Sequence, residues 1–80
     1  MKTLQIIYYA LMREQRGLSE ETLESAATTV NELYTELQQK YPFTLSRDVL
    51  KVAVNDEFCD WQAPLKSGDC VVFIPPVAGG

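Results

Sequence analysis

The C-terminal stretch of the chain, residues 70–80, places the strongest constraint on its fold. It consists of five apolar residues, two consecutive prolines, Val77, Ala78 and a pair of glycines. An apolar run of this length predicts a buried strand. Because proline has a fixed φ and no amide proton to donate, the strand must end before Pro75. Residues 75–80 are therefore predicted to form an extended tail outside the folded body.

The tip of this tail carries the group with the most distinctive chemistry, the α-carboxylate of Gly80. In polyproline geometry, at about 3.1 Å per residue, the tail would reach on the order of 18 Å from the body. Gly79 and Gly80 have no side chains, so the tip is thin enough to thread into another protein's active site. If an enzyme adenylated the carboxylate with ATP, a thiol, a persulfide or an amine could attack the resulting anhydride. The alternative interpretation is a loose chain end without a role.

The length and charge of the chain limit its class. Eighty residues, 46% of them hydrophobic, predict a single globular domain over residues 1–80. The net charge of −4 argues against binding to nucleic acid, which requires a basic surface. The longest apolar stretch is too short to cross a bilayer, and the first residues lead into a strand pattern rather than a signal peptide. We therefore expect a cytoplasmic protein that binds neither nucleic acid nor membranes.

The chain lacks the residue types of a self-contained catalytic or metal site. Cys59 and Cys70 do not form a C-x-x-C pair, and the sequence contains no histidine. The absence of histidine removes the Ser-His and Cys-His nucleophile arrangements. The two cysteines are interpreted as small buried hydrophobic residues. We expect no bound metal, and acid–base chemistry that depends on other proteins.

The N-terminal part of the chain predicts two strands. Residues 3–10 have apolar side chains at both parities, which is typical of a central strand covered on both faces. Residues 11–17 carry charges and end in a glycine that suits a turn, so they predict a solvated connection. Residues 18–24 predict a short edge strand that returns antiparallel to the first strand.

The clearest periodic pattern predicts a helix over Thr29–Lys40. Thr29 and Glu32 fit a capping box, in which the hydroxyl binds the third amide of the helix and the carboxylate reaches back to the cap. The following apolar residues form one helical stripe: Val30, Leu33, Tyr34, Leu37 and Tyr41. Pro42 disfavours helical geometry at Tyr41 and predicts the end of the helix. We expect this stripe to pack against a sheet.

The C-terminal half predicts the remainder of a small mixed sheet. Residues 51–55 alternate in polarity and predict a strand, followed by a hairpin turn at Asn55-Asp56 into Phe58-Cys59. The element order is then β-β-α-β-β, which predicts an α+β roll with one main helix across one face of the sheet. The first and last strands are expected to lie side by side and parallel.

The last strand is expected to present apolar side chains on both of its faces. Alternation places Val71 and Phe73 on one side, and Cys70, Val72 and Ile74 on the other. The set that points away from the helix predicts a docking patch for a partner protein. The alternative is that Trp61 and residues 56–65 partly shield this face.

Four motifs are spread along the chain between residues 10 and 80. The most specific is Pro64-Leu65-x-x-Gly68-Asp69 followed by Val71-x-Phe73-x-Pro75-Pro76-Val77-x-Gly79-Gly80. The shorter ones are Ala10-x-x-Arg13-Glu14-x-x-Gly17, Thr29-Val30-x-Glu32-Leu33 and Val52-Ala53-Val54-Asn55. Together these residues resemble the small subunits of molybdopterin synthase, a family of ubiquitin-like β-grasp sulfur carriers. Cys70 departs from the pattern, because the family commonly has an acidic residue after Gly-Asp.

The resemblance implies a route for the chemistry of the tail. An ATP-dependent activating enzyme similar to ubiquitin activators would adenylate Gly80, and a sulfur donor protein would convert the adenylate into a thiocarboxylate. The tail would then enter the large subunit of molybdopterin synthase. There its sulfur would pass to cyclic pyranopterin monophosphate to build the dithiolene of molybdopterin. The chain itself would bind no cofactor, since ATP is used by the activating enzyme.

The resemblance also implies roles for the residues that precede Gly80. The predicted partner-binding residues are Phe73, Pro75, Pro76, Val77, Ala78 and Gly79. The small residues at the tip would let it pass a narrow channel, while the two prolines would keep the tail extended and lower the entropy lost on insertion. Phe73 is predicted to anchor the interface with the large subunit.

Other functions remain open from the sequence. A sulfur carrier for thiamine biosynthesis or another sulfur pathway would share the fold and the terminal glycines. A ubiquitin-like protein modifier would form an isopeptide bond between Gly80 and lysines of other proteins. A binding module with an inert tail would require the terminal motif to arise by coincidence.

Overall fold

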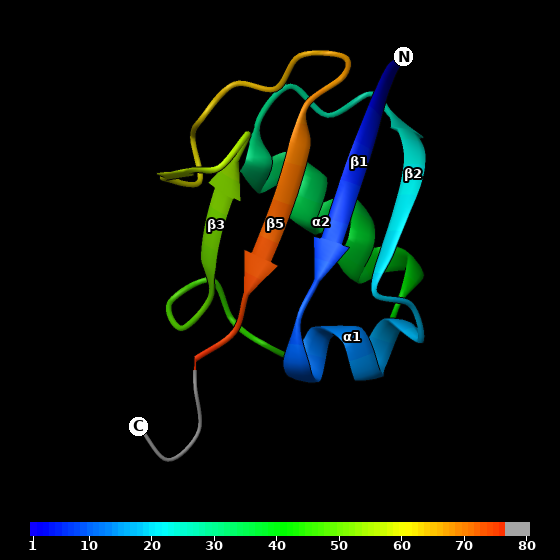
Figure 1. Ribbon diagram of the computed structural model, residues 1–80, viewed down its shortest axis with the longest axis vertical. Helices are drawn as coiled ribbons and strands as arrows, with labels where there is room; N and C mark the ends of the chain where they lie inside the picture. Colours follow the sequence, from blue (N-terminus) through cyan, green and yellow to red (C-terminus); the bar gives the residue numbers. More distant parts are fainter. Residues whose placement is uncertain (77–80) are drawn as a thin grey trace.

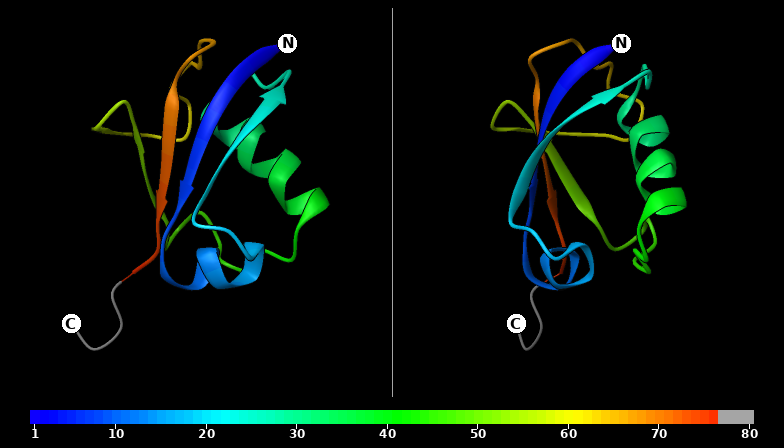
Figure 2. Two further views of the ribbon diagram at one scale, coloured as in Figure 1. Left: turned by 45° about the vertical axis from the view of Figure 1, so that its right-hand side comes forward. Right: turned by 90° about the vertical axis from the view of Figure 1, so that its right-hand side faces the viewer.

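The computed structural model describes residues 1–76, which form a five-stranded sheet and two helices (Figure 1). The strands lie in the order β2-β1-β5-β3-β4. Along the chain the elements are β1 (Lys2–Tyr8), α1 (Ala10–Arg16), β2 (Glu20–Ser25), α2 (Val30–Lys40), β3 (Lys51–Val54), β4 (Glu57–Cys59) and β5 (Cys70–Ile74). Figure 2 shows α2 across one face of the sheet and α1 at one end. The predicted α+β roll is confirmed.

The parallel pair β1 and β5 forms the centre of the sheet. Their register pairs Ile6 with Val71 and Tyr8 with Phe73. The other pairs are antiparallel: β2 lies along β1, and β3 lies between β5 and β4. This confirms the prediction that the first and last strands lie side by side and parallel. The long connection between them, which contains α2, makes such a parallel pair sterically feasible.

Helix α2 begins and ends where its sequence signals predict. The Thr29 hydroxyl accepts a hydrogen bond from the Glu32 amide at 3.2 Å, as a capping box requires. The Glu32 carboxylate, however, accepts from the amide and the hydroxyl of Thr28, one residue before the expected cap. At the other end, Tyr41 is extended, with φ of −131°, as expected of a residue before a proline.

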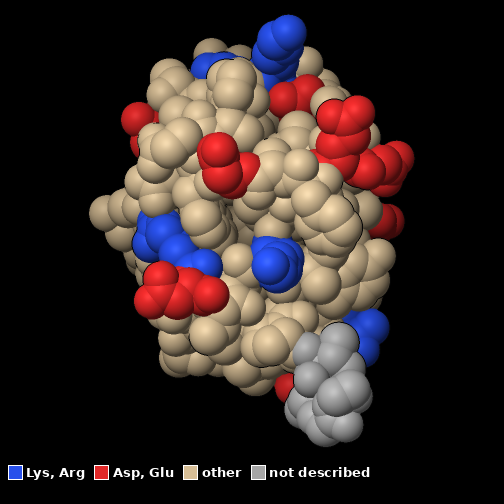
Figure 3. Space-filling model, turned by 90° about the vertical axis from the view of Figure 1, so that its left-hand side faces the viewer, with Lys and Arg blue, Asp and Glu red and all other residues tan. Residues whose placement is uncertain are grey.

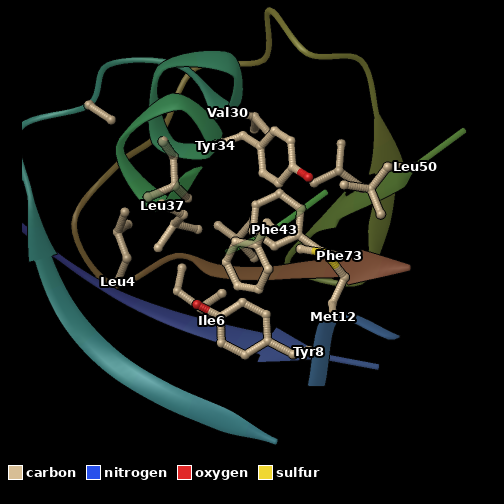
Figure 4. Close-up of a cluster of buried hydrophobic side chains, with 14 of the residues drawn as sticks. Leu4, Ile6, Tyr8, Met12, Val30, Tyr34, Leu37, Phe43, Leu50 and Phe73 are labelled. Atoms are coloured by element: carbon tan, nitrogen blue, oxygen red, sulfur yellow. The ribbon is translucent and has the colours of Figure 1, made fainter. Parts of the chain in front are cut away.

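The hydrophobic core lies between α2 and the sheet. Figure 4 shows side chains of α2 pointing toward those of β1 and β5. Phe43 and Met12 belong to the same buried cluster. An aromatic group holds the centre, in which Tyr34 lies 5.5 Å from Phe73 and 5.4 Å from Trp61 between ring centres. Such aromatic pairs add to the stability that burial alone supplies. The predicted stripe of α2 is therefore a core face.

The segment after β1 is a helix, which corrects the prediction of a solvated connection over residues 11–17. The helix α1 buries Met12 completely and ends at Gly17. Gly17 has a φ of 84°, and its amide donates to the carbonyl of Arg13. A glycine in the left-handed region is a common way to end a helix. The residue types of α1 are good helix formers, and this signal was available in the sequence.

The β3–β4 hairpin follows the prediction. Asn55 and Asp56 both have positive φ, 53° and 69°, as a two-residue type I′ turn requires. The Asn55 side chain also ties this turn to β5, because it donates to Asp69 and accepts from the amide of Cys70. Within residues 1–76 no helix is long and apolar enough to cross a membrane.

Candidate functional site

The end of β5 is where the predicted tail leaves the body. Ile74 is the last residue of the strand and pairs with Lys51 of β3. Pro75 is still buried, and Pro76 is exposed. The strand therefore ends where the two prolines predict. The predicted site residues Val77, Ala78, Gly79 and Gly80 lie outside the residues that the structure describes.

A hollow of about 650 Å³ lies at the base of the tail. Its lining is mainly apolar and comes from three segments of the chain: Tyr9, Ala10 and Leu11; Leu45; and Ile74, Pro75 and Pro76. We call it the tail-base hollow. Apolar concave surfaces are the usual binding places for side chains of partners and for small ligands. Because its walls are far apart in the sequence, no single motif predicted this site.

The face of the sheet opposite α2 presents a row of apolar side chains. The register joins Ile7 of β1 to Val72 of β5, Val72 to Ala53 of β3, and Ala53 to Phe58 of β4. We call these four residues the outer row. Phe58 is 75% exposed, which is unusual for a large aromatic side chain. The outer row confirms that apolar side chains of β5 point away from the helix.

The alternative in which Trp61 shields this face is wrong. The Trp61 ring packs on the helix side of the sheet, 5.4 Å from Tyr34 and 6.3 Å from Phe73 between ring centres. Phe58, which belongs to the segment expected to act as a shield, instead adds exposed apolar surface. Among residues 1–76, the outer row therefore offers an exposed Phe58 and a partly exposed Ile7 and Val72, while Ala53 is buried.

The structure places Phe73 in the core, which corrects its predicted role as an interface anchor. Its side chain has no exposed surface. It lies on the side of β5 that faces α2, and its ring stacks on Tyr8 at 6.4 Å. A buried ring cannot contact a partner while the domain stays folded. Ile74, its partly exposed neighbour on the other side of the strand, lines the tail-base hollow instead.

A second groove, of about 520 Å³, lies beside β3 on the other side of Ile74. Phe58, Trp61 and Leu50 contribute apolar surface to it. Arg47 and Lys51 contribute positive charge, and Asp48 contributes negative charge. Figure 3 shows that this side of the molecule is mainly uncharged, with a few basic and acidic side chains, two of opposite charge lying next to each other. Apolar surface thus continues from the outer row to the groove, since Phe58 belongs to both.

A partly buried ion pair lies between α1 and β2. Arg16 of α1 donates to the Glu21 carboxylate in a bidentate pair, at 2.8 Å from Nε and from Nη2. The Tyr8 hydroxyl donates to the same carboxylate at 2.7 Å. Hydrogen bonds from Arg16 hold the pKa of Glu21 below its usual value, against an opposing effect of burial. Burial, together with the bond to Glu21, raises the pKa of Tyr8. Both groups therefore keep their charge states around neutral pH.

The two cysteine thiols are free and are not activated as nucleophiles. Burial, followed by the nearby Asp60 carboxylate, raises the pKa of Cys59. Burial, followed by Asp56, raises the pKa of Cys70. A thiol with a raised pKa is mostly protonated at neutral pH and reacts slowly. Among residues 1–76, no three Cys, Asp or Glu side chains are grouped as a metal site would require.

Comparison with curated proteins relates the whole chain to sulfur carriers. The molybdopterin synthase sulfur carrier subunit of Mycobacterium tuberculosis is 35% identical over 83 residues, covering 100% of both chains. The subunit of that name from Haemophilus influenzae is 31% identical over 80 residues, covering 96% of this chain and 99% of the relative. The match to the Mycobacterium tuberculosis subunit covers the whole of both chains and therefore includes the terminal glycines.

Solved structures show the same fold. A chain in a complex of subunits 1 and 2 of molybdopterin-converting factor from Helicobacter pylori is 28% identical, with a TM-score of 0.70 over 98% of this chain and 99% of the other. Small archaeal modifier protein 1 from Methanosarcina acetivorans has a TM-score of 0.81 at 21% identity, over 100% of this chain and 98% of the other. The ubiquitin-like β-grasp fold inferred from the motifs is thus confirmed.

The family model agrees with these relatives. The model of the ThiS family matches residues 6–80, which include the end of β1, all of β5, α2, the walls of the tail-base hollow and the terminal glycines. The resemblance to ubiquitin-like sulfur carriers that the sequence motifs indicate is confirmed, and the chain belongs to the ThiS family.

Proposed function

We propose that this chain is the sulfur carrier subunit of a molybdopterin synthase. The observation that carries the proposal is the combination of full-length similarity to subunits of that name with a strand that stops at Pro75 and is followed by a tail ending in two glycines. The sulfur would be carried on the carboxyl group of Gly80. The chain would thus be the sulfur-donating half of a two-subunit sulfurtransferase, with no complete catalytic site of its own.

The chemistry proceeds in three steps on the Gly80 carboxyl group. A carboxylate oxygen attacks the α-phosphate of ATP in an activating enzyme similar to ubiquitin activators, and pyrophosphate leaves. A hydrosulfide equivalent from a sulfur donor protein then attacks the acyl carbon, and AMP leaves with that oxygen, so a thiocarboxylate forms. In the large subunit the sulfur passes to cyclic pyranopterin monophosphate, and hydrolysis returns Gly80 to a carboxylate. Because the activation step uses ATP, we place these steps in the cytoplasm.

The described surface supports the docking that these steps require. The tail can reach a partner's active site only if that partner binds close to Pro76, the last described residue. The tail-base hollow adjoins Pro76, and the outer row lies on the uncovered face of the sheet that contains β5. Exposed apolar surface of this kind usually marks a protein interface. We therefore assign the outer row and the tail-base hollow to docking of the large subunit.

Two related functions share the chemistry of the terminus. A carrier for another sulfur pathway would receive sulfur in the same way, and a protein modifier would be conjugated through Gly80. The similarity to a small archaeal modifier is too distant to show more than the fold. The named relatives at 31% and 35% identity favour molybdopterin synthase over both.

The test is to charge the chain and then determine its mass. Incubation with an activating enzyme, ATP and a sulfur source should replace one carboxyl oxygen by sulfur, which intact-mass spectrometry detects. A matched variant with one alanine added after Gly80 should fold normally and stay unmodified. Conjugates of higher mass in place of the thiocarboxylate would favour a modifier. A wild-type chain that no activating enzyme modifies would contradict the proposal.

A further inference from the structure

Helix α1 forms one wall of the tail-base hollow, yet its short length and the geometry of its first turn make it only weakly stable on its own. It has seven residues, no side-chain hydrogen bond at its N-cap Tyr9, and a positive φ of 50° at Ala10. Isolated helices shorter than about 12 residues are marginal in water, and a positive φ at a residue other than glycine adds strain. The positions of Tyr9, Ala10 and Leu11 must therefore be fixed by contacts elsewhere on the helix.

One such contact is Met12, which is buried in the core, and the polar contacts lie at the other end of α1. Arg16 makes the bidentate pair with Glu21 of β2, and its guanidinium lies 4.0 Å from the centre of the Tyr41 ring. Gln15 exchanges hydrogen bonds with the side chain and the amide of Thr44, at 2.8 Å and 3.2 Å. The helix is thus tied both to β2 and to the segment 41–50, which supplies Leu45 to the tail-base hollow.

The burial and geometry of the Arg16–Glu21 ion pair suit it to fixing the position of α1. The side chains of Arg16 and Glu21 are only 20% and 13% exposed, so water screens the pair less than a surface pair. Tyr8 of β1 is 1% exposed, and its hydroxyl donates a hydrogen bond to the Glu21 carboxylate. Bidentate charged pairs of this geometry are stronger and more directional than single hydrogen bonds. We call Arg16 and Glu21 the α1 latch.

We infer that the α1 latch is a positioning device for partner docking. It holds α1 so that Tyr9, Ala10 and Leu11 stand opposite the segment 74–76 in the geometry that the large subunit meets. The inference rests on the proposed function, because it assumes that the large subunit binds around the base of the tail. Arg16 and Glu21 do not line the hollow themselves, so their replacement acts on docking through the helix.

The test compares Arg16→Ala, Glu21→Ala and the double variant for affinity to the large subunit, at a temperature where all three are folded. Each single variant should weaken binding roughly tenfold. The double variant should weaken it no further, because either substitution already opens the latch. If the two residues contacted charges of the partner directly, replacing an arginine and a glutamate would change the affinity in opposite directions. Opposite changes in affinity for the two single variants would overturn the inference. So would a double variant whose loss is the sum of the single losses, or affinities equal to that of the wild type.

A control variant separates positioning from general loosening of the fold. Val30→Ala truncates a fully buried side chain at the start of α2, where the Val30 amide donates to the carbonyl of Ala63. The start of α2 lies far from α1 (Figure 1). The latch variants should speed hydrogen exchange of the α1 amides, and Val30→Ala should change neither that exchange nor the affinity. An equal loss of affinity in Val30→Ala would overturn the inference.

The two proposals fail in different ways. A wild-type chain that cannot be charged, or that does not bind the large subunit, contradicts the proposed function. A wild-type chain that is charged and bound normally, with latch variants that bind as tightly as it does, contradicts the positioning role alone.

Discussion

At position 73, the alternation of a single strand decides between a core residue and an interface residue. Phe73 faces α2 and lies among Tyr8, Tyr34 and Trp61. Phe73→Ala should lower the free energy of unfolding by about 3–5 kcal/mol, because it removes a buried ring and leaves a cavity. Urea titration measures this loss, and Ile74→Ala, on the other side of the strand, should cost less. A loss below about 1 kcal/mol for Phe73→Ala would contradict its place in the core.

Glu21 should make stability depend on pH. Its pKa in the folded chain is lowered from an ordinary value near 4.5 by the hydrogen bonds from Arg16. The stabilisation is therefore complete above about pH 4.5 and is lost as the pH falls through the lower folded pKa. Glu21→Gln should reduce the free energy of unfolding by roughly 1 kcal/mol near neutral pH, since the pair is partly exposed.

The pH series supplies the control for this prediction. In acid, the difference between wild type and Glu21→Gln should disappear, because the protonated wild-type carboxyl is then uncharged, as the glutamine side chain is at every pH. Glu24→Gln, which alters an exposed glutamate of the same strand, should change little at any pH. A difference between wild type and Glu21→Gln that stays constant across the pH range would show that the charge of Glu21 does not contribute.

At the scale of elements, local signals separate what could be predicted from what could not. Helix α2 and the end of β5 were predicted because a cap, an apolar stripe and a pair of prolines act on their immediate neighbours. Helix α1 was missed although its residues are good helix formers, because it buries only Met12 and is held by Glu21 and Thr44, which belong to other segments. The tail-base hollow was missed for the same reason, since three separate segments form it.

The end of α1 offers a test of its local geometry. Gly17 has a φ of 84°, and a Cβ built at this position would meet no atom within 4 Å. Gly17→Ala should therefore lower the free energy of unfolding by about 1 kcal/mol through backbone strain alone. Thermal unfolding measures this loss, with Glu14→Ala, at an exposed position of the same helix, as a control that should change stability by less than about 0.5 kcal/mol. An unchanged stability in Gly17→Ala would contradict the left-handed cap.

At the scale of the whole molecule, the domain has a closed side and an open side. Helix α2 covers the core side of the sheet. On the other side Phe58 is exposed, and an exposed aromatic ring does not stabilise the isolated domain. Phe58→Ser should change the free energy of unfolding by less than about 0.5 kcal/mol. It should weaken binding of the large subunit by about tenfold, as expected for an exposed aromatic residue that an interface buries.

A matched variant makes this prediction specific. Leu18→Ser alters another exposed apolar residue, which lies before β2 and outside the outer row. Titration calorimetry with the large subunit should show a loss of affinity for Phe58→Ser and none for Leu18→Ser. Equal losses, or no loss in either variant, would remove the outer row from the docking surface.

The central claim is that the whole fold serves to present Gly80 as the carrier of one transferable sulfur. The most direct measurement is a single turnover with the chain charged with radiolabelled sulfur, mixed with the large subunit and cyclic pyranopterin monophosphate. We predict that the label moves to the pterin product while the mass of the chain returns to that of the carboxylate. Product formation at the same rate from the uncharged chain, or label that stays on the chain, would contradict the claim.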